Sequence, residues 1–316
     1  KSFGVDEFSA RFPSAVFGLG LILLQYLFLS RFCGALVGLF GALMLLLNIQ
    51  IIGLARMVLT DSVLVFLTTL SLFSFWLGFQ GHDRERWWRW VFYIGMALAT
   101  LAKGPVGFLV PLVTIALYLT ATRQCGRFWC TGAPLAGLLL FVAIALPWYV
   151  IMWTLHGTEY AASAQANTVG RFLNPMEGHS FSILFYIPVL LLGFFPWSGW
   201  LPYAWYGAYA NWRRARRPGQ QESVDSTQQL EWFAAAWVLG VFLFFTLSST
   251  RLPHYIAPLF PAAALLTASF WHRGLLNPET WGVRAAIHTM AGIGYLLGNG
   301  LVALPSLYPS FAGKLT

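Results

Sequence analysis

Charged residues are scarce in this sequence. Asp, Glu, Lys and Arg make up 9% of its 316 residues, whereas 58% are hydrophobic. Soluble domains carry about 25% charged residues, so this chain has too few charges to cover a soluble surface around so much apolar bulk. The composition therefore excludes a disordered chain, a coiled coil and a disulfide scaffold, and it indicates an integral membrane protein.

Cysteine and regular alternation are also lacking. Cys33, Cys125 and Cys130 form no CxxC pair and no metal-binding spacing, so we expect no disulfide. Apolar and polar residues do not alternate strictly, which disfavours an outer-membrane β-barrel. The net charge of +8 is better explained by basic residues that flank membrane spans than by nucleic-acid binding. The chain starts at Lys1 without a Met or a signal peptide, and we expect an N-terminal part to be missing.

What the sequence does have is long apolar runs, bounded by charges, Pro and Gly. They fall at roughly 14–30, 33–54, 62–80, 90–102, 105–121, 131–152, 183–205, 231–247, 255–271 and 286–305. The pattern predicts an all-α integral membrane protein, with a bundle of about ten spans in one domain over residues 1–316. Lys103-Gly104-Pro105 divides the stretch 90–121, which predicts two short helices that meet at a tip.

Lys and Arg are divided unequally between the two ends of these spans. If the loop after 14–30 is cytoplasmic, twelve of the 19 Lys and Arg residues face the cytoplasm and seven lie outside. The positive-inside rule favours this orientation. It places the long polar loop at about 153–182 on the outside, where its side chains could line a site.

Asp61 is the only acid between Phe8 and Gln80. It opens an apolar helix, so it could simply be an N-cap. A carboxylate at the membrane surface near Arg56 could instead act as a base or orient a substrate hydroxyl. The two roles are compatible, and we take Asp61 as the candidate catalytic residue and Arg56 as a candidate substrate ligand.

Three other residues on the same side are candidate ligands of an anion. Lys103 interrupts an apolar run next to a Gly-Pro turn; the alternative to a functional role is a side chain that extends to the lipid headgroups. Arg251 and His254 lie at a proline-broken span start, where they could bind a phosphate. Tyr255 follows them, and together they could equally be an interface anchor.

Several segments, in order, resemble one family. They are Arg56-Met57-Val58-Leu59-Thr60-Asp61, Thr100-Leu101-Ala102-Lys103-Gly104-Pro105, Leu146-Pro147-Trp148-Tyr149, Arg171-Phe172 with His179, Gly193-Phe194-Phe195-Pro196-Trp197-Ser198 and Leu252-Pro253-His254-Tyr255. This set, over about 1–272, is similar to the bacterial membrane glycosyltransferases of family 39, which include the 4-amino-4-deoxy-L-arabinose transferase of lipid A and relatives of the protein O-mannosyltransferases. The resemblance implies a GT-C fold, a polyprenyl-phosphate-linked sugar donor, a lipid or protein acceptor, and transfer at the periplasmic side of the bacterial inner membrane.

The resemblance also implies roles for single residues. Asp61 matches an acid of the second external loop, and His179 matches a metal-binding histidine, which implies a divalent metal and no nucleotide cofactor. Without the resemblance, the spacing of residues around His179 indicates an ordinary loop histidine rather than a metal ligand. Arg171, Lys103, Arg251 and His254 match motif positions and are taken as substrate ligands. The family's main catalytic acid and a metal-binding Glu lie upstream of the segment that resembles Phe3 to Pro13, so we expect the chain as given to be inactive.

Two other functions compete with this interpretation. A transporter or lipid flippase would also place lone charges near broken helices, but the sequence has no inverted repeat and its isolated charges gather on one side. A membrane scaffold would not need a lysine at a Gly-Pro tip. Neither alternative explains the ordered set of segments.

Overall fold

The chain is described here from a computed structural model that covers residues 6–81, 86–166, 170, 183–217, 225–277 and 279–307. All regular elements in these residues are helices, which confirms the expected all-α class. In chain order they are α1 (Glu7–Cys33), α2 (Ala35–Leu46), α3 (Ile49–Arg56), α4 (Asp61–Gln80), α5 (Trp88–Lys103), α6 (Val106–Thr122), α7 (Cys125–Thr131), α8 (Pro134–Gln165), α10 (Tyr186–Gly193), η3 (Trp197–Gly199), α11 (Leu201–Ala215), α12 (Ser226–Leu247), η4 (Pro253–Leu259), α13 (Phe260–Leu276) and α14 (Trp281–Leu307).

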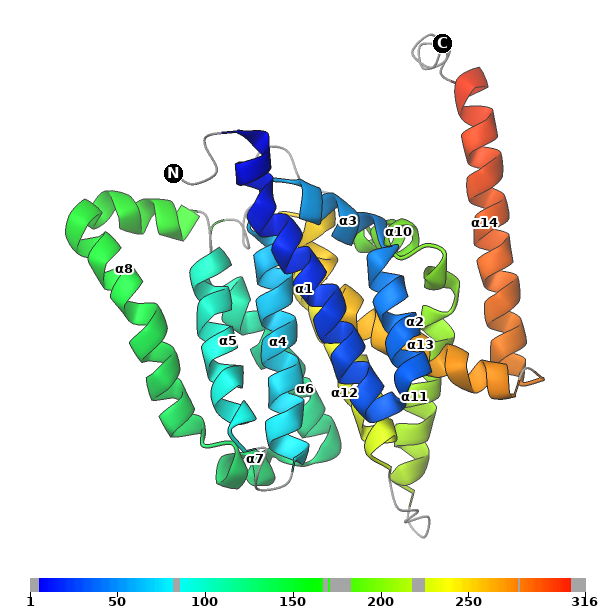
Figure 1. Cartoon of the computed structure of the whole chain (residues 1–316), viewed down its shortest axis with the longest axis horizontal. Coiled ribbons are helices and arrows are strands. Elements are labelled where there is room, and N and C mark those ends of the chain that lie inside the picture. Colours follow the sequence, from blue (N-terminus) through cyan, green and yellow to red (C-terminus); the bar gives the residue numbers. More distant parts are fainter. Residues whose placement is uncertain are drawn as a thin grey trace.

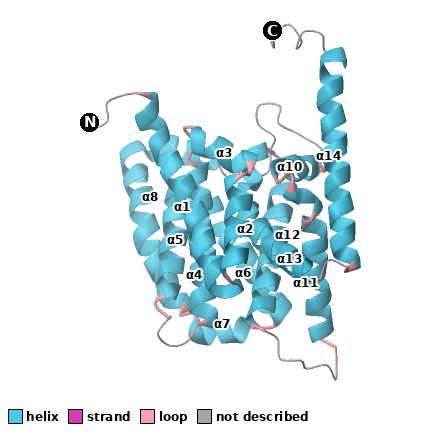
Figure 2. Ribbon diagram, turned by 45° about the vertical axis from the view of Figure 1, so that its right-hand side comes forward, coloured by secondary structure: helices cyan, strands magenta, loops and turns pink. Residues whose placement is uncertain are grey.

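The long helices run up and down a bundle, as Figure 1 shows: α1, α4 and α6 run downward, and α2, α5, α8 and α12 run upward. The short helices lie across the ends, with α3 and α10 at one end and α7 at the other (Figure 2). We call the end where α4 begins the site end (Asp61, Lys103 and Arg251) and the opposite end the arginine end (Arg31, Arg123, Arg127, Arg213 and Arg273). For these described residues, the basic side chains that the sequence assigns to the two sides of the membrane therefore lie at opposite ends of the bundle.

Four of the described helices are long and apolar enough to cross a membrane: α1, α4, α8 and α12. The bent pairs α2–α3 (60°) and α6–α7 (119°) raise this number to six if each pair counts as one span. For the described part of the chain, length and composition thus support four to six of the ten expected spans. The shorter helices α5, α11 and α13 pack among them.

Helix α4 is at the centre of the bundle. Its Phe73 and Trp76 are almost completely buried, with Phe73 stacked on Phe28 of α1 and Trp76 against Phe233 of α12. Because lipid is as apolar as these side chains, close packing rather than transfer from water holds such helices together. This packing fixes the height of α4, and hence the position of Asp61 at its first turn.

Two expected segments differ in the structure. The loop expected from residue 153 is helical as far as Gln165, because α8 continues through a sharp bend at Gly157, whose φ of 54° suits a residue without a Cβ. The run 183–205, expected as one span, is broken into α10, η3 and the start of α11, because Pro196 and Pro202 cannot donate the backbone hydrogen bonds that a continuous helix needs.

The predicted tip between two short helices is confirmed. Helix α5 ends at Lys103 and α6 begins at Val106. Gly104 has φ 68° and ψ −150°, a region reserved almost entirely for glycine. At Gly107 a Cβ atom would lie 2.2 Å from the carbonyl carbon of Ala99. The hairpin is therefore closed by two glycines, and it holds Lys103 at the site end.

This close approach makes Gly107 sensitive to substitution. Gly107→Ala must push α5 and α6 apart, and overpacking of this kind costs about 1–3 kcal/mol. Gly126 in α7 is the matched control, since beyond its own helix backbone and chain neighbours no atom lies within 4 Å of the position that an added methyl group would occupy. At that position the same change should be neutral or slightly stabilising. Thermal unfolding of the purified variants in detergent, followed by tryptophan fluorescence, checks this, and equal midpoints would contradict it.

Candidate functional site

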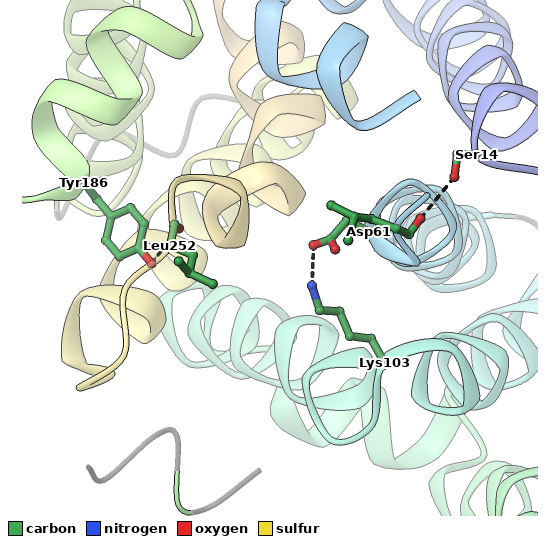
Figure 3. Close-up of polar contacts among 6 residues, drawn as sticks. Ser14, Asp61, Lys103, Tyr186 and Leu252 are labelled. Carbon is green, nitrogen blue, oxygen red and sulfur yellow. Dashed lines mark hydrogen bonds and ion pairs between the residues drawn. The ribbon is translucent and has the colours of Figure 1, made fainter. Parts of the chain in front are cut away.

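The site is built around an ion pair between two helix ends. Asp61 is the first residue of α4 and Lys103 is the last residue of α5. The Lys103 Nζ donates to the Asp61 Oδ1 (Figure 3). Their side chains are 5% exposed for Asp61 and 25% exposed for Lys103. Burial of a charge is costly unless it is paired, so each group stabilises the other at this depth.

This pair corrects two expectations about Asp61. Thr60, not Asp61, occupies the N-cap position of α4, and Thr60 makes no side-chain capping bond. Arg56, the expected neighbour of Asp61, ends α3 as an exposed residue that forms no ion pair with any other described residue. The sequence could not reveal the true partner because Lys103 lies 42 residues away in the chain.

The short helix η4 brings two more predicted residues to this pair. The Lys103 Nζ lies 5.2 Å from the centroid of the Tyr255 ring, a distance typical of a cation–π contact. The rings of His254 and Tyr255 are perpendicular and 5.0 Å apart. The structure therefore brings together Asp61, Lys103, His254 and Tyr255, four of the residues that the sequence offers as site candidates.

His254 is within electrostatic range of both charges of the pair. Burial lowers the pKa of His254 below its ordinary value of 6.5, the Asp61 carboxylate raises it, and the Lys103 ammonium lowers it. Since the net direction is downward, His254 is uncharged at neutral pH. It can therefore accept or donate a hydrogen bond at the site without adding charge.

Arg251 lies at the same end, four residues before Tyr255. Its Nη2 donates to the carbonyl oxygen of Thr246 at 3.0 Å, near the C-terminus of α12, where helix carbonyls lack partners. The guanidinium thus supports the end of α12, and it remains a candidate ligand for an anion. Arg171 and His179, the two other predicted site residues, lie outside the described residues.

Three polar side chains at the site were missed by the sequence analysis. The Tyr186 hydroxyl donates to the Leu252 carbonyl at 3.2 Å, and the Gln50 Nε2 donates to the Pro253 carbonyl at 3.2 Å. The Ser14 hydroxyl donates to the Leu59 carbonyl at 3.1 Å, just before Asp61 (Figure 3). These bonds hold the backbone that precedes His254 and Asp61. Their signal in the sequence is only a polar residue in an apolar run, which does not identify the carbonyl it binds.

The described residues alone do not form a metal site. They contain no group of three or more His, Cys, Asp or Glu side chains that could hold an ion. At the site end the carboxylate of Asp61 is already engaged by the ammonium of Lys103, and a cation beside a metal ion would repel it.

Comparison with known proteins places the chain in a family. Residues 1–161 match the family model described as dolichyl-phosphate-mannose-protein mannosyltransferase. An undecaprenyl phosphate-alpha-4-amino-4-deoxy-L-arabinose arabinosyl transferase from Edwardsiella ictaluri is 26% identical over 309 residues, which are 96% of this chain and 53% of that protein. Its counterpart from Pseudomonas aeruginosa is 28% identical over 319 residues, with 96% and 52% covered.

Solved structures agree with the sequence matches. The crystal structure of ArnT from Cupriavidus metallidurans bound to undecaprenyl phosphate superposes with a TM-score of 0.79 and 25% identity, over 96% of this chain and 52% of that one. The expected GT-C membrane fold is confirmed, and the chain is a multi-pass membrane protein. The chain spans about half the length of the curated relatives it matches.

The electrostatic effects at His254 give a signed prediction. Asp61→Asn removes the carboxylate that raises the pKa of His254, so this pKa should fall further below 6.5. Glu7→Gln removes a carboxylate of the same sign that pairs with Arg11 near the start of α1, and it should leave the pKa unchanged. Histidine-labelled NMR titration, assigned with a His254→Gln variant, measures both. An upward or absent shift in Asp61→Asn would disprove the proposed proximity.

Proposed function

Because this chain belongs to the dolichyl-phosphate-mannose-protein mannosyltransferase family, we propose that the protein transfers a sugar from a polyprenyl-phosphate donor to a hydroxyl acceptor at the membrane surface. The observation that carries this proposal is the buried Asp61–Lys103 pair at one end of the bundle. It offers a cation for a phosphate and a carboxylate for a hydroxyl in one place.

In this proposal Lys103 and Arg251 bind the donor phosphate, His254 and Tyr255 line the site, and Arg56 stays a candidate substrate ligand from the sequence alone. The acceptor oxygen forms a bond to the anomeric carbon of the sugar. The bond between that carbon and the phosphate oxygen breaks, its electron pair leaves with the phosphate, and the hydroxyl proton passes to a carboxylate such as Asp61. A positioned base contributes about 10²–10⁴-fold to a rate, and cations stabilise the leaving phosphate.

The nature of the substrates follows from the relatives. Those named as arabinosyl transferases use an undecaprenyl-phosphate-linked aminoarabinose, and the similar crystal structure holds undecaprenyl phosphate. We extend the lipid carrier to this protein and take a lipid or a protein as the acceptor. Arg171 as a substrate ligand and a divalent metal at His179 remain proposals from the family resemblance.

Removal of the site cations tests the function. In the full-length protein, Lys103→Ala and Arg251→Ala should reduce the use of an undecaprenyl-phosphate-linked sugar, because a hydrogen bond to a charged group contributes about 1.5–3 kcal/mol. Arg214→Ala is the control and should have little effect, because Arg214 follows Arg213 in the last turn of α11 at the arginine end. The readout is transfer in a reconstituted assay, with size-exclusion profiles to confirm folding. Equal small losses at all three positions would contradict a phosphate site.

The orientation is also proposed, with the site end outside the cytoplasm, in the periplasm of a bacterial inner membrane. The basic residues clustered at the arginine end support it. Cys125 and Cys130 are exposed at that end, so a membrane-impermeant maleimide should label them only after the cells are permeabilised. A cysteine at exposed Thr158, at the site end, should be labelled in intact cells. The reverse labelling pattern would invert the orientation.

A further inference from the structure

The proposed function makes two demands on the same pair of side chains. Lys103 must hold the donor phosphate, and Asp61 must be free to receive the acceptor's proton. In the structure each is occupied by the other. An ammonium shared by a carboxylate and a phosphate would bring two anions together, and like charges at contact distance repel strongly where water is excluded. Phosphate binding and the Asp61–Lys103 pair are therefore competitors.

We propose that the Asp61–Lys103 ion pair acts as a latch. The phosphate of the lipid donor binds Lys103 in place of Asp61, and Asp61 becomes available to the acceptor only after the donor has bound. This inference rests on the proposed function and adds an order of events to it. Until the donor arrives, the Asp61 Oδ1 accepts a hydrogen bond from the Lys103 Nζ and is not open to the acceptor hydroxyl.

The exposures of the two side chains fit this order. Lys103 is 25% exposed, whereas Asp61 is 5% exposed. A ligand that enters the site thus reaches the Lys103 side chain more readily than the Asp61 side chain. The lysine side chain is a flexible stem with three donors, so it can turn from Asp61 to a phosphate while its ammonium stays near the Tyr255 ring, 5.2 Å away.

The position of Asp61 lowers the cost of opening the pair. Asp61 is in the first turn of α4, where backbone N–H groups lack helical partners and the helix dipole favours a negative charge. The N-cap residue Thr60 makes no side-chain bond to these groups. A carboxylate released by Lys103 therefore remains next to donors that stabilise it, and the uncharged His254 is close by.

Competition has a consequence that runs against ordinary expectation. If a residue only supports the fold, or only takes part in the chemistry, a variant that lacks it should bind the donor as well as the wild type or less well. If Asp61 competes with the phosphate for Lys103, removal of its charge must strengthen phosphate binding even as turnover falls. By linkage, this gain depends on Lys103 and disappears when Lys103 is removed.

The experiment is a titration of the purified full-length protein in detergent with undecaprenyl phosphate, measured by native mass spectrometry. Asp61→Asn should bind about tenfold tighter than the wild type, the change expected for release of one charged hydrogen bond. Lys103→Met should bind about tenfold weaker. The double variant Asp61→Asn/Lys103→Met should bind no tighter than Lys103→Met alone. Glu7→Gln, with the same loss of charge outside the site, should match the wild type.

The possible outcomes test the latch separately from the proposed function on which it rests. Tighter binding by Asp61→Asn that requires Lys103 supports the latch. Unchanged or weaker binding by Asp61→Asn, with normal wild-type binding, overturns the latch and leaves the proposed function intact. A gain that persists without Lys103, or an equal gain in Glu7→Gln, reduces the effect to bulk charge and overturns the latch as well. No binding by the wild type removes both proposals. If Asp61→Asn does not fold, Asp61→Ser provides the same charge loss with a side chain suited to a helix start.

Discussion

A lysine ammonium and a single carboxylate, enclosed together at one end of an apolar bundle, set the conditions for the rest of the site. Asp61 and Lys103 stabilise each other at this depth, because a buried charge is costly unless it is paired. Helix α4 must therefore begin where α5 ends, and the α5–α6 turn must be tight enough to leave the ammonium there. Gly104 and Gly107 meet this requirement, one by its backbone conformation and the other by its lack of a Cβ.

The irregular backbone around this pair is held by side chains from distant helices. A segment broken by prolines leaves carbonyl groups without helical partners, and such groups are tolerated at membrane depth only where protein satisfies them. Tyr186 and Gln50 bind the two successive carbonyls of Leu252 and Pro253, directly before His254. Polar side chains in otherwise apolar helices thus hydrogen-bond to these backbone carbonyls. By holding this backbone they place His254 and Tyr255 beside Lys103.

The two ends of the bundle use charge differently. At the arginine end the basic residues are numerous and mostly exposed, as is typical of residues that anchor spans at a headgroup layer. At the site end, Asp61, Lys103 and His254 are partly enclosed and close enough to affect one another. This contrast, together with the family match and the likeness to a structure that holds undecaprenyl phosphate, supports a single anion-handling site at one membrane surface.

The sequence by itself determined the class of protein and most of the helix positions. Scarce charge and long apolar runs leave only a helical membrane bundle, and Lys103-Gly104-Pro105 marks the α5–α6 tip because Gly and Pro end helices locally. Asp61, Lys103, His254 and Tyr255 were identifiable as odd residues in apolar surroundings. Only the tertiary structure decided that Lys103 rather than Arg56 pairs with Asp61, that Tyr186 and Gln50 hold η4, and that α8 continues past the expected start of the loop. These facts depend on contacts between residues far apart in the chain and on a bend at Gly157, which hydrophobic periodicity does not encode.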